Sequence, residues 1–302
     1  MERIEYCCWP DCIRLTNGQM EVVVTTVVGP RVIHCGFVGG QNLFGVMEDT
    51  AGMMGGDEWR LYGGHRLWHS PEEMPRSYSP DNEPIEVVPA EDRHGGVQLV
   101  QDVEPDTGIQ KEMEITLSAK ENRVDVLHRL TNEGVWPVEL APWALTVMAK
   151  GGEAIVPQPG GDLNSLLPNR RLTLWPYTNM SDPRLNWGDK YIRMRQREDM
   201  PPRCKFGLSA PDGWLAYLLN QDLFVKRFDY EPECEYPDWG SAVEIFTNDT
   251  ILEVETLGPL VFLEPGEFVE HVERWYLFQG VAVDDTEASI DDSLLPLLEQ
   301  TE

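Results

Sequence analysis

Residues 12–27, CIRLTNGQMEVVVTTV, carry the pattern that decides the fold class. Two runs rich in apolar and β-branched side chains flank Asn17 and Gly18. An Asn-Gly pair between such runs is the strongest short-range signal for a β-hairpin, because both positions tolerate the positive φ angles that the turn needs. The stretch therefore predicts two antiparallel strands joined by a tight turn.

Similar strand-like runs follow along most of the chain. They include residues 122–132 (NRVDVLHRLTN), 241–258 (SAVEIFTNDTILEVETLG) and 259–278 (PLVFLEPGEFVEHVERWYLF). Many strands at short spacing, with few helical patterns, predict an all-β fold, a large antiparallel β sandwich. No linker divides the chain, so we expect one domain over residues 1–280. The acidic residues 281–302 are expected to form a short helix or a frayed tail.

Turn signals divide these runs. Asp212-Gly213 and Asn248-Asp249 are expected to be hairpin turns between neighbouring strands. Residues 45–84 are rich in glycine, proline, methionine and charge, and they show no strand or helix period. They therefore predict a long connection, of the kind that often carries function.

The charge balance argues against two classes of partner. The chain has 24 basic and 52 acidic residues, a net charge of -28. Nucleic acid and anionic membrane surfaces would be repelled by this excess. The apolar stretches are too short to span a bilayer. A small neutral ligand such as a sugar is compatible with the composition.

The cysteines and the N-terminus predict a cytoplasmic protein. Residues 1–12, MERIEYCCWPDC, contain no apolar signal core. The six cysteines form no paired CxxC motifs, which argues against a zinc ribbon and favours reduced thiols.

The densest cluster of candidate chemistry is GGHRLWHSPEE, residues 63–73. It could be a metal site, a catalytic loop, a ligand-binding loop or a surface turn. The glycines before it and the proline after it argue against a helix. On an extended segment, His65 and His69 point one way and Arg66 and Trp68 the other. A zinc site would need further ligands, and no second His/Cys cluster is evident, so neither metal nor cofactor is expected.

Three stretches together resemble the galactose-mutarotase-like (aldose 1-epimerase-like) superfamily, in an uncharacterised bacterial branch. They are residues 15–44, 126–148 and 251–278, taken in this order and spacing. The resemblance implies a β supersandwich with a sugar pocket on a concave sheet face. It assigns the catalytic base to Glu255 and places Trp143 where the family has an acid histidine. The GG-x-R-x-W run also resembles a sugar-phosphate epimerase branch, in which an arginine grips an anionic group.

Other residues are candidates by their own pattern. Alternation along a strand puts Glu253 and Glu255 on one face. Lys226 and Glu244 are charges within apolar strands, which suggests either a ligand or a buried ion pair. Trp59, Trp68 and Trp143 could be platforms for a sugar face or ordinary core residues.

The leading hypothesis is therefore a sugar mutarotase, an isomerase acting at the anomeric carbon. A glutamate base and a histidine acid would move the protons. The alternatives are a sugar-binding module without catalysis, and a carbohydrate lyase or glycoside-modifying enzyme on the same fold. The sugar, which could be neutral, acidic or phosphorylated, and the oligomeric state stay open. The candidate catalytic residues are Glu255, His65 and His69, and the candidate substrate-binding residues are Arg66, Lys226, Trp143, Glu244 and Trp68.

Overall fold

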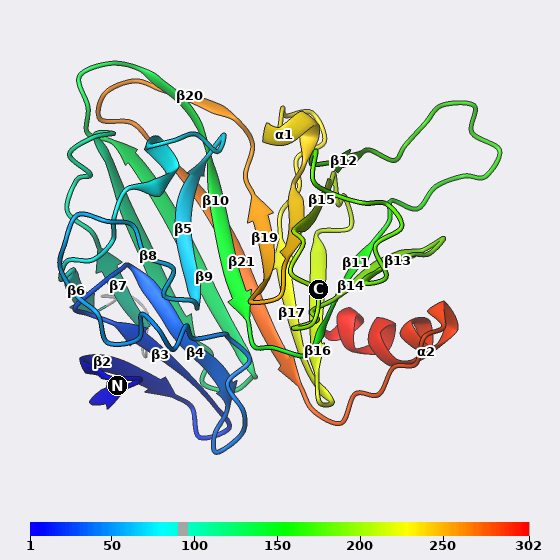
Figure 1. Cartoon of the computed structure of the whole chain (residues 1–302), viewed down its shortest axis with the longest axis horizontal. Helices are drawn as coiled ribbons and strands as arrows, with labels where there is room; N and C mark the ends of the chain where they lie inside the picture. Colours follow the sequence, from blue (N-terminus) through cyan, green and yellow to red (C-terminus); the bar gives the residue numbers. More distant parts are fainter. Residues whose placement is uncertain (90–95, 302) are drawn as a thin grey trace.

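The computed structural model describes residues 1–89 and 96–301, which form two antiparallel sheets packed face to face (Figure 1). Within these residues the first sheet has 11 strands and the second has 10. The first runs in the order β1 (Glu2–Tyr6), β2 (Trp9–Thr16), β3 (Met20–Thr25), β4 (Arg31–Phe37), β5 (His65–Ser70), β10 (Val138–Met148), β19 (Leu252–Leu257), β18 (Val243–Thr247), β15 (Cys204–Leu208) and β12 (Leu172–Leu174), with β20 (Val261–Leu263) also paired to β10. The second runs in the order β13 (Leu185–Trp187), β14 (Tyr191–Arg195), β11 (Glu153–Pro157), β16 (Trp214–Leu219), β17 (Asp222–Phe228), β21 (Phe268–Phe278), β9 (Arg123–Asn132), β8 (Ile109–Leu117), β7 (Gly96–Val100) and β6 (Glu86–Pro89). The predicted large antiparallel β sandwich is confirmed.

The main core lies between the two sheets. In β8 and β9, buried and partly exposed residues alternate along the whole strand, so one face packs inward and the other meets solvent. The strands β5 and β19 are instead buried at every position. One of their faces packs on the second sheet, and the other forms the floor of a cavity described below.

The Asn-Gly hairpin forms as predicted. Gly18, between β2 and β3, has a φ angle of 88°, which favours glycine. The Asn17 side-chain oxygen accepts hydrogen bonds from the backbone N–H groups of Gln19 and Met20, at 3.0 and 2.9 Å. Asn17 also donates to the Ser118 carbonyl, so the turn is tied to the second sheet.

Of the other two predicted hairpin turns, one is confirmed and one is wrong. Asn248 and Asp249 lie between β18 and β19, which pair antiparallel. Asp212 and Gly213 lie between β15 and β16, which belong to different sheets. Both pairs consist of residues that favour turns, and such residues serve a crossover between sheets as readily as a hairpin within one sheet.

The expectation of one long connection over residues 45–84 is wrong at its centre. His65–Ser70 is the strand β5, which pairs with β4 on one side and β10 on the other. Polar side chains occupy both faces of this strand, so it lacks the apolar alternation from which strands are predicted. Gly63 and Gly64, with φ angles of 88° and 68°, turn the chain into it.

The acidic C-terminal segment contains the helix α2 (Glu287–Leu298), and Thr286 caps its start by accepting a hydrogen bond from the Ser289 N–H. The buried residues Ile290, Leu294 and Leu298 recur every four positions and pack on the outer face of the second sheet. Shorter helical turns are η1 (Arg76–Tyr78), α1 (Pro237–Gly240) and η2 (Glu299–Thr301).

No helix among the described residues has the length and apolarity needed to cross a membrane. The six cysteines are all free, as expected from their spacing; Cys12, Cys35 and Cys204 are buried.

Candidate functional site

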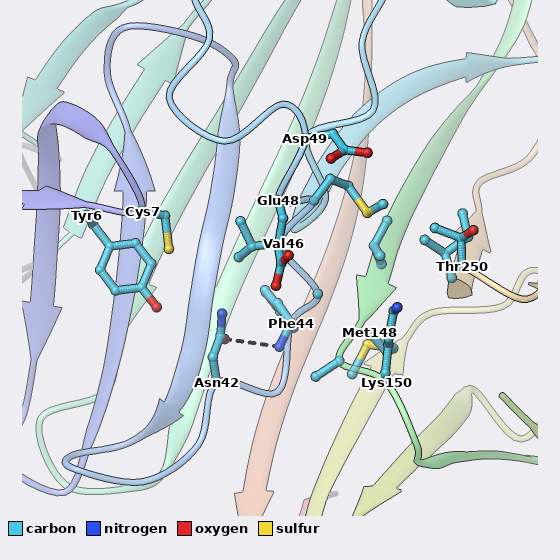
Figure 2. A pocket seen from close by; sticks show the side chains of 15 residues that line it. Tyr6, Cys7, Asn42, Phe44, Val46, Glu48, Asp49, Met148, Lys150 and Thr250 are labelled. Atoms are coloured by element: carbon cyan, nitrogen blue, oxygen red, sulfur yellow. Dashed lines mark hydrogen bonds between the residues drawn. The ribbon is translucent and has the colours of Figure 1, made fainter. Parts of the chain in front are cut away.

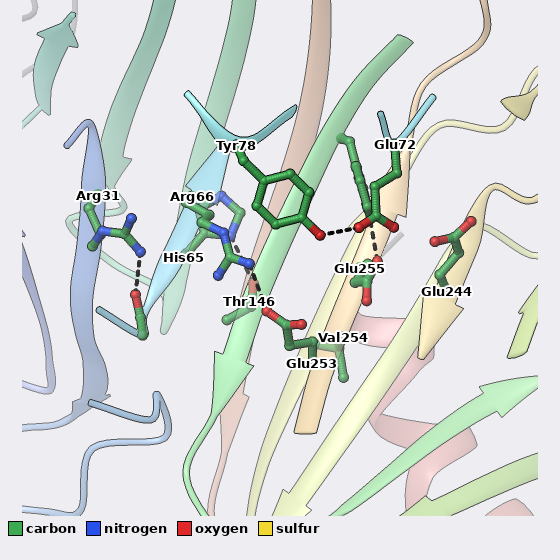
Figure 3. A network of polar contacts seen from close by, with 12 residues as sticks. Arg31, His65, Arg66, Glu72, Tyr78, Thr146, Glu244, Glu253, Val254 and Glu255 are labelled. Carbon is green, nitrogen blue, oxygen red and sulfur yellow. Dashed lines mark hydrogen bonds and ion pairs between the residues drawn. The ribbon is translucent and has the colours of Figure 1, made fainter. Parts of the chain in front are cut away.

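A cavity of about 310 Å³ lies on the face of the first sheet that turns away from the second sheet. Its floor is built from the central strands. Arg66 and Trp68 come from β5, Trp143 from β10, and Glu253 and Glu255 from β19. The predicted alternation on both strands is confirmed, because the residues between these side chains point toward the second sheet. Figure 3 shows Arg66, Glu253 and Glu255 side by side on this face.

Glu255 is almost fully buried at the cavity floor, with 1% of its surface exposed. Its Oε2 atom accepts a hydrogen bond from Trp143 Nε1 at 2.8 Å and another from Lys205 Nζ at 3.1 Å. Both contacts fall on Oε2, and no hydrogen bond from the described residues reaches Oε1. Burial raises the pKa of the Glu255 carboxyl above its ordinary value, and Lys205 offsets part of this rise. A carboxylate with a raised pKa is a stronger base.

Lys205, on β15, is the residue of this site that sequence reasoning missed most clearly. Its ammonium lies 2.6 Å from Glu244 Oε2 and 3.1 Å from Glu255 Oε2. It also sits over the rings of Trp143 and Trp175, at 4.8 and 4.6 Å. Burial opposes its charge, but the two carboxylates outweigh burial and raise the pKa of Lys205 well above its ordinary value. Lys205 therefore stays a fixed cation beside Glu255.

Glu244 lies beside Glu255, its register partner on the neighbouring strand. It is fully buried on β18, opposite Gly207 of β15, and it contacts Lys205 without lining the cavity. Burial raises its pKa well above the ordinary value, although Lys205 acts in the opposite direction. The expected role of Glu244 in direct substrate binding is thus replaced by a role in holding Lys205.

Arg66 lines the cavity and has two hydrogen-bond donors without a partner among the described residues. Its Nη2 donates to Glu253 Oε1 at 3.0 Å, and its guanidinium lies over the Trp68 ring at 4.8 Å. Within the described residues, Nε and Nη1 have no hydrogen-bond partner, although the side chain is only 3% exposed. Buried donors without partners are costly, so these two nitrogens suit a polar ligand.

The walls of the cavity are mainly aromatic. Trp59, Trp68 and Tyr78 contact one another edge to face, and Trp68 continues to Trp143. Tyr78 donates a hydrogen bond to Glu72 (Figure 3). Aromatic rings of this kind pack against the apolar face of a sugar ring.

A second aromatic group comes from the segments beside β12 and β15. Trp175 and Tyr177 line the cavity, and Arg203 lies over the Tyr177 ring at 4.4 Å. Burial raises the pKa of the Tyr177 hydroxyl to about 12, so it stays protonated at neutral pH. Nothing in the local sequence predicted these residues, since they reach the site only through the pairing of β15 with β18.

The two histidines proposed as acids do not reach this cavity. His65 and His69 lie on the opposite face of β5, toward the second sheet, and they are 0% and 1% exposed. His69 Nε2 lies 3.6 Å from Glu104 Oε2, and Glu104 also binds Lys111. The alternation along β5 was predicted correctly, but it separates both histidines from Arg66 and from Glu255.

Lys226 is also placed in the interior rather than in the cavity. It is fully buried on β17, and its ammonium lies 2.8 Å from Glu273 Oε1 on β21. Of the two alternatives, ligand and buried ion pair, the structure shows the ion pair. Trp275 Nε1 and Thr256 Oγ1 donate further hydrogen bonds to Glu273, at 2.7 and 2.5 Å.

His65 belongs to a chain of hydrogen bonds beside this ion pair. His128 Nδ1 lies 2.9 Å from the His271 carbonyl, which can only accept, so this nitrogen carries the proton. His128 Nε2 must then accept from His65 Nε2, at 2.7 Å, and His65 Nδ1 accepts from Thr146 Oγ1, at 2.8 Å. Every polar group in this series of hydrogen bonds has a partner when the histidine rings are neutral.

The side chains of His65, His128 and Glu273 are close enough together to hold a metal ion, since one ligand atom from each lies within 4.8 Å of the others. Their present contacts do not favour one. The two ring nitrogens already share a proton, and the Lys226 ammonium neutralises Glu273. A divalent ion would displace a proton and lie beside a buried cation.

We predict that these interior histidines stay neutral in mildly acidic solution. Burial lowers the pKa of His65 and His128, and it lowers the pKa of His271 to about 3. At pH 5.5 an exposed histidine, with a pKa of about 6.5, would be about ten to one protonated. Nitrogen-15 NMR of the ring nitrogens should instead show neutral rings, with the Nδ1–H tautomer for His128. Charged imidazolium signals at pH 5.5 would contradict this arrangement.

The same pKa shifts determine whether the stability of the fold rises or falls with pH. A histidine that is neutral when folded but protonated when unfolded makes the fold less stable as pH falls below about 6.5. Glu244 and Glu255, whose pKa values are raised, act in the opposite direction above about pH 4.5. Because the two contributions oppose each other, NMR of the ring nitrogens reports the charge of the histidines more directly than the pH dependence of unfolding does.

Comparison with known proteins gives a clear result for the fold. No protein-family model and no curated protein sequence matches the chain. A galactose mutarotase-like protein from Lactobacillus casei superposes with a TM-score of 0.56 at 10% identity, over 88% of this chain and 100% of that one. One from Clostridium acetobutylicum gives 0.55 at 11% identity, over 92% and 98%.

A candidate aldose 1-epimerase from Klebsiella pneumoniae gives a TM-score of 0.59 at 9% identity, over 96% of this chain and 83% of that one. The chain therefore has the galactose-mutarotase-like fold, as three stretches of its sequence predicted.

Proposed function

We propose that this galactose-mutarotase-like sandwich binds a sugar in the cavity above β5, β10 and β19 and interconverts its two anomers. The main support for the proposal is the environment of the Glu255 carboxylate. This carboxylate is buried at the floor of an aromatic cavity, has a raised pKa and keeps one oxygen free. Such a group is suited to act as a general base.

The proton movements can be assigned to the residues that line the cavity. Glu255 Oε1 takes the proton from the anomeric hydroxyl while the bond between the anomeric carbon and the ring oxygen breaks and the ring oxygen receives a proton. The carbonyl group formed then turns, and the reverse proton transfers close the ring as the other anomer. The Tyr177 hydroxyl is our candidate for that donor, because it remains protonated at neutral pH and the hydrogen bonds of the described residues do not use it. Lys205 keeps its charge throughout and stabilises the Glu255 carboxylate.

The charges of the cavity favour a neutral sugar. Three cations, Arg66, Arg203 and Lys205, stand beside the acids Glu72, Glu253 and Glu255. An acidic or phosphorylated sugar would have to rely on the free donors of Arg66 and on Arg203.

A second candidate function is sugar binding without turnover. The sequence resemblance puts Trp143 at the position of the family's acid histidine, and Trp143 donates a direct hydrogen bond to Glu255. A glycoside hydrolase is less well supported, because it needs two carboxyl groups that reach the scissile bond. Glu244 is fully buried and does not line the cavity, and the two other acids that do, Glu253 and Glu72, are bound by Arg66 and Tyr78.

The direct test follows the approach to anomeric equilibrium for a panel of neutral aldoses, uronic acids and sugar phosphates, by polarimetry and by NMR. Acceleration over buffer for one class supports an epimerase and identifies its substrate. Saturable binding with no acceleration supports the second candidate. Absence of both for every sugar would reject the proposal.

Arg66→Ala is predicted to weaken sugar binding by about ten- to a hundredfold, because hydrogen bonds from a charged donor contribute about 1.5–3 kcal/mol. Titration calorimetry with the sugar found in the panel measures this. Arg66→Lys is the matched control, since it keeps the charge opposite Glu253 but loses the planar donors. Wild-type affinity in Arg66→Ala would show that the free nitrogens do not contact the ligand.

A further inference from the structure

A second and larger cavity, of about 550 Å³, adjoins the first on the same face of the sheet. Ile251 lines both cavities. Along β10, Trp143 and Leu145 line the first cavity and Val147 lines the second. These three residues alternate with residues that face the second sheet, so they form one row. The two cavities are thus successive parts of one groove along β10 and β19.

The length of this groove exceeds one sugar ring. Glu255, Glu253 and Ile251 follow one another at every second residue, and an extended strand rises by about 3.3 Å per residue. Ile251 therefore lies about 13 Å along the chain from the proposed base. A ring bound at Glu255 leaves the Ile251 end for the next unit.

The lining of the second cavity suits a neutral, hydroxyl-rich ligand. Val147 lies on its floor, and its lining also includes the acids Glu48 and Asp49, the cation Lys150 and the hydroxyl of Thr250. Figure 2 shows the Glu48 carboxylate near the centre of the view, with Tyr6 on one side and Thr250 on the other. Glu48 and its neighbour Asp49 are exposed acids. They can accept hydrogen bonds from hydroxyl groups and would repel an anionic ligand.

We propose that the groove binds a neutral oligosaccharide through its reducing end. The reducing-end ring lies at Glu255, where its free anomeric hydroxyl is needed, and the following units pass over Ile251 into the second cavity. This inference rests on the proposed function, because it assumes that the first cavity holds a sugar.

The test compares affinity within matched series of neutral sugars. Glucose, maltose and maltotriose form one series, and glucose, cellobiose and cellotriose form another. Binding is followed by the quenching of tryptophan fluorescence, since Trp59, Trp68 and Trp143 line the first cavity. In one series, the trisaccharide is expected to bind at least about tenfold more tightly than glucose.

Thr250→Trp supplies the matched variant, because Thr250 is exposed and lines only the second cavity. The added ring is expected to abolish the tenfold advantage of the trisaccharide and leave glucose affinity unchanged. Thr131→Trp, on the outer face of β9, is the control for a new surface tryptophan. It should retain the advantage.

Two results would overturn the inference. Equal affinity for one-, two- and three-ring sugars in wild type and in Thr250→Trp would limit the ligand to the first cavity and leave the proposed function intact. Absence of binding by any sugar, including monosaccharides, would overturn the proposed function together with the groove.

Discussion

Replacing Glu255 by glutamine should slow anomer interconversion by about 10²–10⁴-fold while leaving sugar binding within about threefold of wild type. Glutamine keeps the shape of the side chain, and its oxygen can still accept the hydrogen bonds from Trp143 and Lys205. It cannot take a proton from the anomeric hydroxyl. A loss confined to turnover is the signature of a base.

The measurement is NMR exchange between anomers at saturating sugar, combined with calorimetry for the dissociation constant. Glu139→Gln is the matched control, because Glu139 is an exposed glutamate of β10 outside the cavity. Equal turnover in Glu255→Gln and wild type would remove Glu255 from the mechanism. It would also shift attention to Tyr177 and Glu253 as the groups that exchange protons with the ligand.

Replacing Lys226 by methionine should lower the free energy of unfolding by about 3–5 kcal/mol, because it leaves the buried Glu273 carboxylate without its cation. The histidine at 3.9 Å, His65, can then gain a proton more easily. Since this protonation is easier at low pH, the loss of unfolding free energy should be larger at pH 8 than at pH 6. Urea unfolding at the two pH values measures both effects.

The double variant Lys226→Met, Glu273→Gln removes both charges. The glutamine oxygen can still accept from Trp275 Nε1, and its amide NH2 group can donate to the Thr256 hydroxyl. It should recover most of the stability, since replacing a whole buried ion pair is often nearly neutral. If Lys226→Met unfolded like wild type but lost sugar affinity, Lys226 would be a ligand residue, as its position in an apolar strand first suggested.

The sequence was most informative where a pattern is local. The Asn17-Gly18 turn and the placement of Glu253 and Glu255 on one face of a strand depend on residues a few positions apart, and both were predicted. The alternation of Arg66 with His65 was predicted as well, although the segment was expected to be a loop. Its polar side chains conceal the strand, because two buried polar networks flank it instead of two apolar layers.

The rest of the site depends on pairing between distant segments. Lys205 reaches Glu255 only because β15, β18 and β19 are neighbours in the sheet, about fifty residues apart in the chain. Lys205 and Lys226 look alike in sequence, because each is a lysine among apolar strand residues. Lys205 faces a cavity because β15 belongs to the first sheet, and Lys226 faces the other sheet because β17 belongs to the second.

The order of strands in the two sheets has a consequence for how the chain acquires its structure. β19 lies at the centre of the first sheet and β21 near the centre of the second, although both come from the last quarter of the described chain. Until these two strands arrive, β9 and β10 each lack a neighbour, and their open edges can pair with other chains. We therefore expect slow folding governed by non-local contacts, with the early intermediates exposed to aggregation.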